Sequence, residues 1–368
     1  MRDHWGNCIT HFDDKVDGFL ADYFGEPDRR CLLVAAAGFD PRSQVVTRKL
    51  SAILGDRLKA FFIREERGRP AENLLQRADE NEATLRSVVQ DAEVVKIDVF
   101  AEDGAAVGGQ RLIEVLRTLT IPEDVTDVVL DMSALSIGIG FPAARLLLER
   151  CERAASRSFH LVIVSNPELD ERISSEPADR PLVVRGFAGT SADGDLPKAR
   201  IWLPQLAHGR SSTLSKIGLS IDERYKVCPI VPFPSRNPRR ADELITEYRS
   251  QLVNEWDVDP RDLVYVSERN PLDCYRTLQM LKQRHDKAVA GVYEPQIILS
   301  PVGSKVLAAG AMMAAIEYDL AIHYLETLRY DFDGIEDRED GPPDIIVHML
   351  LSGPAYGDYG GIATASDV

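Results

Sequence analysis

The sequence has few of the residues that build disulfide-bonded or metal-binding proteins. Its 368 residues include five cysteines and seven histidines. The cysteines are odd in number, far apart and without a C-x-x-C pair: Cys8, Cys31, Cys151, Cys228 and Cys274. Such spacing indicates reduced thiols in a cytoplasmic protein, and the histidines form no H-E-x-x-H motif or comparable cluster. We therefore expect no metal site and a cytoplasmic location.

Long apolar segments and a positively charged leader are also missing. The longest apolar run, from Val306 to Ile316, has eleven residues and stops at Glu317. A helix needs about 20 apolar residues to cross a bilayer. The N-terminus leads directly into polar sequence, whereas a signal peptide continues into an apolar region. The sequence therefore predicts no membrane partner.

The chain has fewer basic than acidic residues. Lys and Arg total 43 against 59 Asp and Glu, which gives a formal net charge of −16. This sign repels a phosphate backbone, and phosphate contacts supply most of the non-specific affinity for nucleic acids. We expect no long nucleic acid as a partner. A small anionic ligand stays compatible with the charge, because one lysine, arginine or helix N-terminus reverses the potential locally.

The usual glycine motifs for nucleotide cofactors are absent. No predicted strand is followed by G-x-G-x-x-G or by G-x-x-x-x-G-K-[ST]. These motifs carry nicotinamide binding and P-loop ATP hydrolysis, respectively. We therefore expect no cofactor.

What the chain does have is a regular alternation of buried strands and helices. Predicted strands cover 31–37, 58–63, 94–99, 127–130 and 159–164, then 227–231, 263–266, 296–299 and 321–325. Helical patterns separate most of them, as in parallel sheets with crossover helices. The predicted fold class is α/β, with two tandem Rossmann-like three-layer domains and mainly parallel sheets.

The length favours two domains. Residues 166–226 are rich in Gly, Pro, Ser, Asp and Arg and show little periodicity, so we place the connection there. We predict an N-terminal domain over 1–200 and a C-terminal domain over 201–368. The second domain is expected to end in an acidic tail at 331–343 and an edge strand at 345–351.

The two halves show signs of a duplication. The first strand of each predicted domain breaks into a turn with proline and arginine, which is Arg42 in the first half and Arg236 in the second. A later strand breaks into a serine-bearing loop before a helix, at 131–136 and at 300–305. Repeated spacing of this kind indicates related units.

The second of these loops carries a short motif. Gly303-Ser304-Lys305 follows a strand and opens a helix of small residues, an arrangement that resembles the CARF domains that sense cyclic oligoadenylates. Two such folds in one chain resemble SAVED-type sensors. The resemblance implies a cyclic oligonucleotide messenger and a role in prokaryotic antiviral defence. Ala134-Leu135-Ser136, at the same place in the first half, lacks the glycine and the lysine.

Ligand-binding candidates come from the loops at the carboxyl ends of the predicted strands, where open α/β sheets bind ligands. The helix N-termini there favour anions, and arginine, lysine and hydroxyl groups add donors. Helix capping and surface ion pairs are the alternative explanation for the same residues. The candidates are Asp40, Arg42, Ser43, Asp131, Ser133, Ser136, Ser235, Arg236, Ser300, Gly303, Ser304 and Lys305.

A further cluster, at 268–276, combines carboxylates, a phenol and arginines after a strand. Carboxylates beside a sugar or a phosphodiester support hydrolysis. The catalytic candidates, should the protein be an enzyme, are Glu268, Asp273 and Tyr275. A helix cap with a salt-linked loop explains the cluster equally well.

Three functions follow as hypotheses. The leading one is a regulatory sensor that binds a small anionic nucleotide between its halves, changes the angle between them and signals to a separate effector or within a homo-oligomer. The alternatives are a hydrolase that cuts a phosphodiester or N-glycosidic bond of a nucleotide, and a scaffold subunit of an assembly. The sensor requires the turns at Arg42, Asp131, Arg236 and Lys305 to meet at one shared edge.

Overall fold

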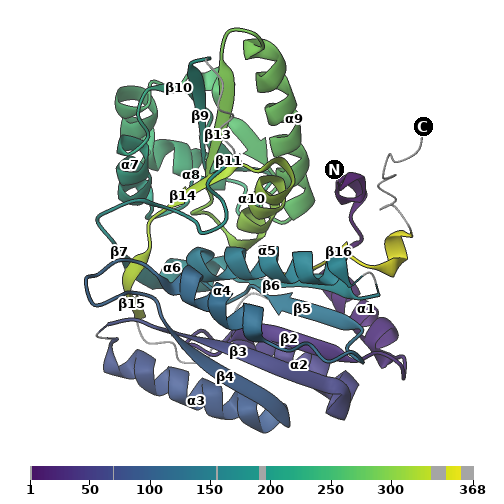
Figure 1. Cartoon of the computed structure of the whole chain (residues 1–368). Coiled ribbons are helices and arrows are strands. Elements are labelled where there is room, and N and C mark those ends of the chain that lie inside the picture. The colour runs from purple at the N-terminus through teal and green to yellow at the C-terminus, as the bar shows by residue number, and fades with distance from the viewer. Residues whose placement is uncertain (1, 69, 155, 190–195, 333–344, 358–368) are drawn as a thin grey trace, which may run out of the picture.

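The computed structural model describes residues 2–68, 70–154, 156–189, 196–332 and 345–357. They form two mainly parallel sheets with helices on both faces, stacked one above the other in Figure 1. The predicted α/β class with two Rossmann-like units is confirmed. None of the helices in the described ranges is long and apolar enough to cross a membrane.

The first sheet has the strand order β1-β16-β6-β5-β2-β3-β4. Its strands are β1 (Thr10–Phe12), β2 (Cys31–Ala36), β3 (Leu58–Glu66), β4 (Asp91–Asp98), β5 (Asp127–Asp131), β6 (Ser158–Ser165) and β16 (Ile345–Ser352). β2 to β6 are parallel to one another, whereas β16 is antiparallel to both β6 and β1. The helices of this unit are α1 (Asp14–Gly25), α2 (Ser43–Leu54), α3 (Glu72–Val88), α4 (Gly108–Thr118) and α5 (Ile137–Arg153).

The second sheet has the order β10-β9-β13-β14-β8, and β11 pairs with β12 beside it. The strands are β8 (Leu182–Val183), β9 (Lys198–Pro204), β10 (Arg224–Val227), β11 (Ile230–Pro232), β12 (Val264–Val266), β13 (Glu294–Ser300) and β14 (Ala321–Tyr324). A parallel bridge between Gln205 and Ile230 continues the β9 ladder onto β11, so β10 and β11 form one interrupted strand. The helices are α7 (Ser211–Leu219), α8 (Arg240–Glu247), α9 (Pro271–Val289) and α10 (Lys305–Tyr318).

The helices form layers around both sheets. One apolar cluster lies between the first sheet and α1, α2 and α3, and another lies between the second sheet and the α7–α8 side. A third, larger cluster includes α4, α5, α9 and α10 together with strands of both sheets. The two units therefore share their middle layer of helices, as Figure 1 shows for α5 and α10.

α10 occupies the centre of this shared layer. All ten residues from Val306 to Ala315 are buried, so the helix has no solvent-facing side. It packs against α9 and also against β6 of the first sheet. A Cβ on Gly310 would lie 2.3 Å from the Pro271 carbonyl oxygen, which shows how closely α9 approaches. The small residues of α10 therefore serve close packing.

Each sheet has the same topology around its centre. In the first, β2 is flanked by β3 and β5, and in the second β9 is flanked by β10 with β11 and by β13. The order reverses between β2 and β5 and again between β9 and β13. Such switch points are where open α/β sheets bind ligands, because the loops on either side diverge.

This topology changes the predicted correspondence between the halves. β9, within the segment that we had read as a connection, is the first strand of the second unit, and the strand before Arg236 takes the second position. The counterpart of Arg42 is therefore Arg210. Each is the N-cap of the following helix and comes six positions after the last strand residue, Ala36 or Pro204.

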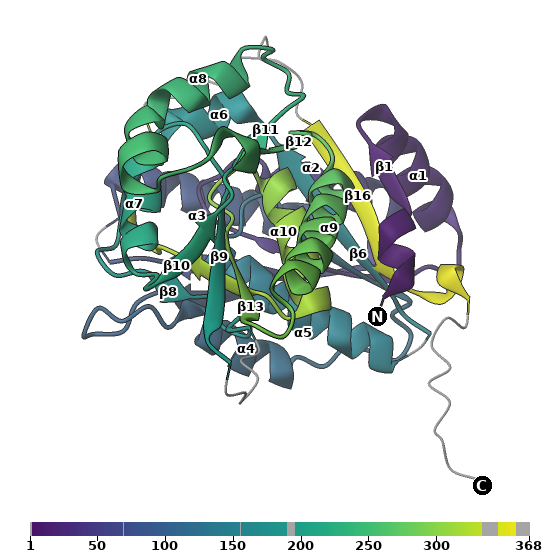
Figure 2. The ribbon, with the colours of Figure 1, turned by 90° about the horizontal axis from the view of Figure 1, so that it is seen from above.

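The chain also returns to the first sheet at its end. We expected 345–351 to form an edge strand of a C-terminal domain over 201–368. β16 instead inserts between β6 and β1, next to β1 in Figure 2. The strand pairing therefore does not follow the predicted division at residue 200, because the first sheet is completed by residues from both ends of the chain. The predicted acidic tail lies almost entirely outside the described residues.

A chain of polar side chains is buried between α1 and the first sheet. His160 accepts or donates at 3.0 Å from Asp127 and at 2.9 Å from His348, and His348 is 3.1 Å from His11. The rings of His160 and His348 are fully buried. Burial, together with the neighbouring histidines, lowers the pKa of His348 well below its ordinary value. The folded state thus keeps His348 neutral at a pH where the unfolded chain is protonated.

This network predicts a loss of stability in mild acid. Because the pKa of His348 is lower in the folded state, the unfolded state takes up the proton first, and the free energy of unfolding falls as the pH drops below about 6.5. The slope is about 1.4 kcal/mol per pH unit for one such group. His348→Gln should flatten this dependence in urea unfolding between pH 7 and 5, and the matched control His208→Gln, with a ring that is 65% exposed, should not. Equal slopes in both variants would contradict the assignment.

Candidate functional site

The loops of both switch points line one cavity. Its volume is about 530 Å³, within the range of about 300 to 1,000 Å³ typical of small-molecule sites. The lining includes the β2–α2 and β5–α5 loops of the first unit and the β9–α7 and β13–α10 loops of the second. The remaining wall comes from a two-stranded ribbon of β7 (Ile173–Pro177) and β15 (Thr327–Phe332), which follow α6 (Pro167–Arg172) and β14, respectively. The two carboxyl edges therefore face each other across one cavity, although Asp131 and Arg236, two of the four residues that the sensor hypothesis placed there, do not line it.

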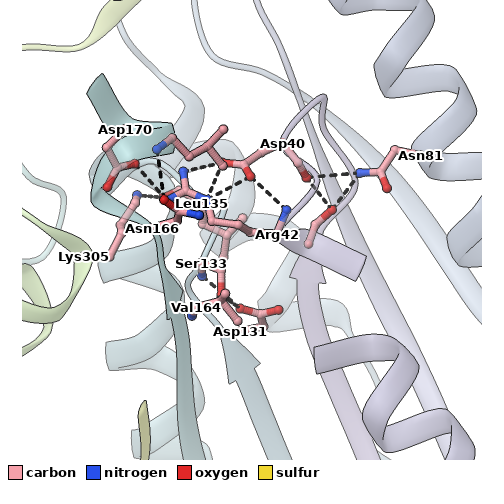
Figure 3. Close-up of polar contacts among 12 residues, drawn as sticks. Asp40, Arg42, Asn81, Asp131, Ser133, Leu135, Val164, Asn166, Asp170 and Lys305 are labelled. Carbon is pink, nitrogen blue, oxygen red and sulfur yellow. Dashed lines mark hydrogen bonds and ion pairs between the residues drawn. The ribbon is translucent and has the colours of Figure 1, made fainter. Parts of the chain in front are cut away.

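The β2–α2 loop contributes an arginine that is held by two carboxylates. The guanidinium of Arg42 donates to Asp40 at 2.6 Å and to Asp170 of α6 at 2.8 Å, as Figure 3 shows. The arginine is 4% exposed. Burial opposes its charge, but Asp40 and Asp170 outweigh this and raise the pKa of Arg42 above its ordinary value. Its charge is thus balanced within the protein.

A second arginine of the first unit links the two halves. Arg67, just after β3, donates to Glu65 at 2.8 Å and to Glu326, beyond β14 of the second unit, at 3.0 Å. Its guanidinium also lies 5.1 Å from the ring centre of Tyr330. Glu65 accepts a further hydrogen bond from the backbone N–H of Ser136 at 2.8 Å. This cluster ties β3, β14 and the start of α5 together.

The second unit presents a lysine without a carboxylate partner. Ser304 caps α10 through its side chain, and Lys305 is the first residue of the helix. The Lys305 ammonium donates to the Leu135 carbonyl oxygen across the cavity, and in the described structure it forms no ion pair with a carboxylate. Burial and the charge of Arg42 lower the pKa of Lys305. An anion beside this ammonium would restore its ordinary protonation behaviour.

The β9–α7 loop contributes Arg210. Its guanidinium donates to the Ser175 hydroxyl of β7, and no described carboxylate pairs with it. Arg210 and Lys305 are on neighbouring strand-to-helix loops of one switch point, where α7 and α10 both begin. The positive end of α10 thus adds to two cationic side chains on this wall, whereas Glu247 accepts a hydrogen bond from the Gly209 N–H just before α7.

Asp131 lies behind the cavity rather than in its wall. Its Oδ1 accepts from the Ser133 hydroxyl and, at 2.9 Å, from the Ser133 N–H, while Oδ2 has no hydrogen-bond partner. Burial raises the pKa of Asp131 to about 7, and the bonds from Ser133 only partly oppose this. The Ser133 hydroxyl in turn is within 2.7 Å of the Val164 N–H, so the pair holds the β5 and β6 ends in place.

The structure gathers some of the predicted residues and separates the rest. Those that line the cavity are Asp40, Arg42, Ser133, Ser136, Gly303, Ser304, Lys305 and Glu268. Those outside its lining are Ser43, Asp131, Ser235, Arg236, Ser300, Asp273 and Tyr275. Most of the second group contribute to packing, turns or helix capping instead.

The residues outside the lining have structural partners. Ser43 donates to the Asp40 carbonyl oxygen, and Ser300 accepts from the Trp202 indole at 2.9 Å inside the core. Ser235 bonds to the Asn237 carbonyl oxygen within its own turn. Arg236 follows a strand in the second position of the sheet, and its side chain is exposed. The proposed edge therefore loses Arg236 and gains Arg210.

Of the three catalytic candidates, one lies in the cavity wall and two do not. Asp273 accepts from the Ser267 N–H at 2.7 Å and so closes the turn before α9. Tyr275 is buried and packs edge-on against Trp5, with ring centres 6.1 Å apart. Glu268 alone of the three lines the cavity, is buried, and accepts from the Arg236 N–H at 3.0 Å. The described residues contain no group of three or more side chains arranged to hold a metal ion.

Several cavity residues had no signal that sequence reasoning used. Arg210 lies after a strand that was read as part of a connection. Glu65 and Arg67 lie at the end of β3, the second strand of the unit, where a carboxylate is a sequence signal in dinucleotide-binding Rossmann folds. Asp170 and Glu326 gain their role only from long-range pairing with Arg42 and Arg67.

Comparison with known proteins identifies no family and finds only distant likenesses. No family model matches the chain, and no curated protein matches it. Among solved structures, a putative rRNA methylase from Clostridium thermocellum is 12% identical with a TM-score of 0.24, covering 44% of this chain and 87% of that one. An NH3-dependent NAD synthetase from Campylobacter jejuni is 9% identical with a TM-score of 0.20, covering 83% and 93%. A putative universal stress protein from Pseudomonas aeruginosa is 10% identical with a TM-score of 0.21, covering 83% and 95%.

The raised pKa of Asp131 predicts a second pH effect. Between about pH 4 and 7 the folded state retains a proton that the unfolded state has lost, so this group makes the protein less stable as the pH rises. Asp131→Asn keeps the acceptor for Ser133 and removes the titration. Relative to the wild type, its free energy of unfolding should increase by about 2 to 3 kcal/mol between pH 5 and pH 7. Parallel curves for the two proteins in denaturant titrations would show that Asp131 is ionised throughout.

Proposed function

We propose that the protein is a nucleotide-sensing regulatory protein that binds a small anionic nucleotide in the cavity between its two switch points and passes the signal to a separate effector. The observation that carries the proposal is that four helices, α2, α5, α7 and α10, begin at loops lining one cavity. Helix N-termini favour anions, and among these four that of α10 is capped by a neutral hydroxyl. Lys305 and Arg210 add charge without a carboxylate partner in the described structure.

The apolar part of the wall suits the rest of a nucleotide. Phe39 of the β2–α2 loop lies 5.4 Å, centre to centre, from Tyr330 of the ribbon, and both line the cavity. Aromatic side chains of this kind stack on nucleic-acid bases, and the stacking does not depend strongly on which base is present. Leu135, Ile137 and Val302 extend the apolar surface between the charged groups. A nucleotide has the matching combination of an aromatic base, a hydroxylated sugar and an anionic phosphate.

Binding is tested directly on the purified full-length protein. Native mass spectrometry of freshly purified material and calorimetry with a panel of mononucleotides and cyclic oligonucleotides should detect a bound nucleotide. Lys305→Ala removes a charged hydrogen-bond donor, which contributes about 1.5 to 3 kcal/mol, so the affinity should fall about tenfold or more. Arg236→Ala, with an exposed side chain outside the cavity, is the matched control and should bind as the wild type does. Unaltered affinity in Lys305→Ala would count against the proposal.

Glu268 supports a second candidate function, hydrolysis of the bound nucleotide. It is a buried carboxylate in the cavity wall, and one of its oxygens is oriented by the Arg236 N–H. A carboxylate placed in this way supports general base catalysis on a phosphodiester or an N-glycosidic bond.

Turnover separates the two candidates. Incubation of the protein with the nucleotide panel, followed by chromatography, should show a product if Glu268 acts as a base. Glu268→Gln preserves the shape and the acceptor for the Arg236 N–H, so it should bind the nucleotide but form about 100-fold less product or less still. A nucleotide that binds and is recovered intact from the wild type identifies the sensor.

A further inference from the structure

The two walls of the cavity carry opposite charge. Around the first unit, Arg42 and Arg67 face four carboxylates with which they form ion pairs: Asp40, Asp170, Glu65 and Glu326. In the second unit, the lining holds Arg210, Arg240 and Lys305 and two carboxylates, Glu268 and Glu326, of which Glu326 pairs with Arg67 of the first unit. The first wall is therefore acidic and the second basic, although the two units share one backbone plan.

The helix N-termini differ in the same sense. At α2, Asp40 accepts from the Arg42 N–H at 3.0 Å, so a carboxylate of the protein already occupies the positive end. At α5, Glu65 accepts from the Ser136 N–H, and a Cβ on Gly138 in the first turn would lie 2.6 Å from a Glu326 oxygen. Both positions where the first unit would bind an anion thus hold the protein's own carboxylates.

In the second unit, one of the two corresponding helix N-termini has no carboxylate beside it. α10 is capped by the neutral hydroxyl of Ser304, whose oxygen is 3.3 Å from the Leu307 N–H. α7 begins at Arg210, which provides no side-chain cap. Glu247 does accept from the Gly209 N–H at 2.9 Å, but it lies outside the cavity lining. The free positive end facing the cavity is therefore that of α10, beside Lys305.

We propose that the cavity binds its nucleotide in one orientation, with the terminal phosphate at Lys305 and Arg210 of the second unit and the sugar and base against the first. The acidic wall accepts hydrogen bonds from ribose hydroxyls and base amino groups and repels a second phosphate. The ligand class is a nucleoside with its phosphate at one end, and a ring with equal phosphates on opposite sides does not match the two walls. This inference rests on the proposed function.

Calorimetry with the full-length protein tests the orientation by comparing the affinities for nucleotides with and without a phosphate. The probes are the four nucleoside 5′-monophosphates, the corresponding nucleosides, and cyclic diadenylate as a symmetric dianion. The wild type should bind one monophosphate at least about tenfold more tightly than its nucleoside, as expected for charged hydrogen bonds to a phosphate. Lys305→Met and Arg210→Met should each remove most of this preference and change the affinity for the nucleoside less than about threefold.

Two matched variants test which wall of the cavity binds the phosphate. Arg236→Met, outside the lining, should keep the full preference for the monophosphate. Asp170→Asn removes a carboxylate of the acidic wall that pairs with Arg42 through a side chain that is 38% exposed, and it should change the affinities for the monophosphate and the nucleoside by similar factors. A preference that rises about tenfold in Asp170→Asn and persists in Lys305→Met would place the phosphate at Arg42 and overturn the inference.

The outcomes separate this inference from the function on which it rests. Binding of cyclic diadenylate with no binding of any monophosphate would keep the nucleotide-binding proposal and refute the orientation. Binding of none of the probes by the wild type would refute both. Protein melting temperatures measured without ligand confirm that each variant is folded.

Discussion

The structure depends on one apolar layer that both sheets share. α10 belongs to the second unit by topology, yet it packs on β6 of the first as well as on α9. Its residues from Val306 to Ala315 are all buried, and six of the ten are alanine or glycine, with Gly310 at the close approach of α9. Because the β13–α10 loop continues directly into this helix, the packing fixes Lys305 opposite the β5–α5 loop. The cavity is therefore a consequence of how the core is built.

The same layer constrains how a bound ligand could act. We expected the two halves to change their angle on binding. One apolar cluster runs through both halves, and separating it would expose apolar surface at about 25 cal/mol per Å². The Arg67–Glu326 ion pair and the insertion of β16 into the first sheet add further links between distant parts of the chain. The wall made by β7 and β15 lies outside both sheets and touches the cavity through Ser175 and Tyr330. For the proposed sensor, a local change in this ribbon would therefore cost less free energy than a change in the angle between the halves.

The sequence predicts the strands well where burial alone defines them. β2 and β6 are buried along their whole length and read as unbroken apolar runs, so both were found to within a residue or two. β9 is as central as β2, but it follows a polar segment and was read as part of a connection. Without β9, the two halves are aligned one strand out of step. Arg236 is then matched to Arg42, whereas the topology matches Arg210 to it. The place of β16 depends on pairing across almost the whole chain, which local patterns do not encode. In the site, the residues of the β13–α10 loop were predicted from their motif, whereas the ion pairs of Arg42 and Arg67 are long-range contacts.

The duplicated units show how one backbone plan supports two electrostatic roles. Arg42 and Arg210 cap equivalent helices at equivalent positions, so geometry alone would give both the same ligand. What distinguishes them is the residue two positions earlier in the first loop, Asp40, together with Asp170 from a helix that lies beyond the parallel strands of that unit. These carboxylates convert a potential anion contact into an internal ion pair that orders its own loop. In the second unit, no described carboxylate pairs with Arg210. The positive end of α10 stays directed at the cavity. A ligand that complements such walls carries its negative charge at one end, beside the second unit.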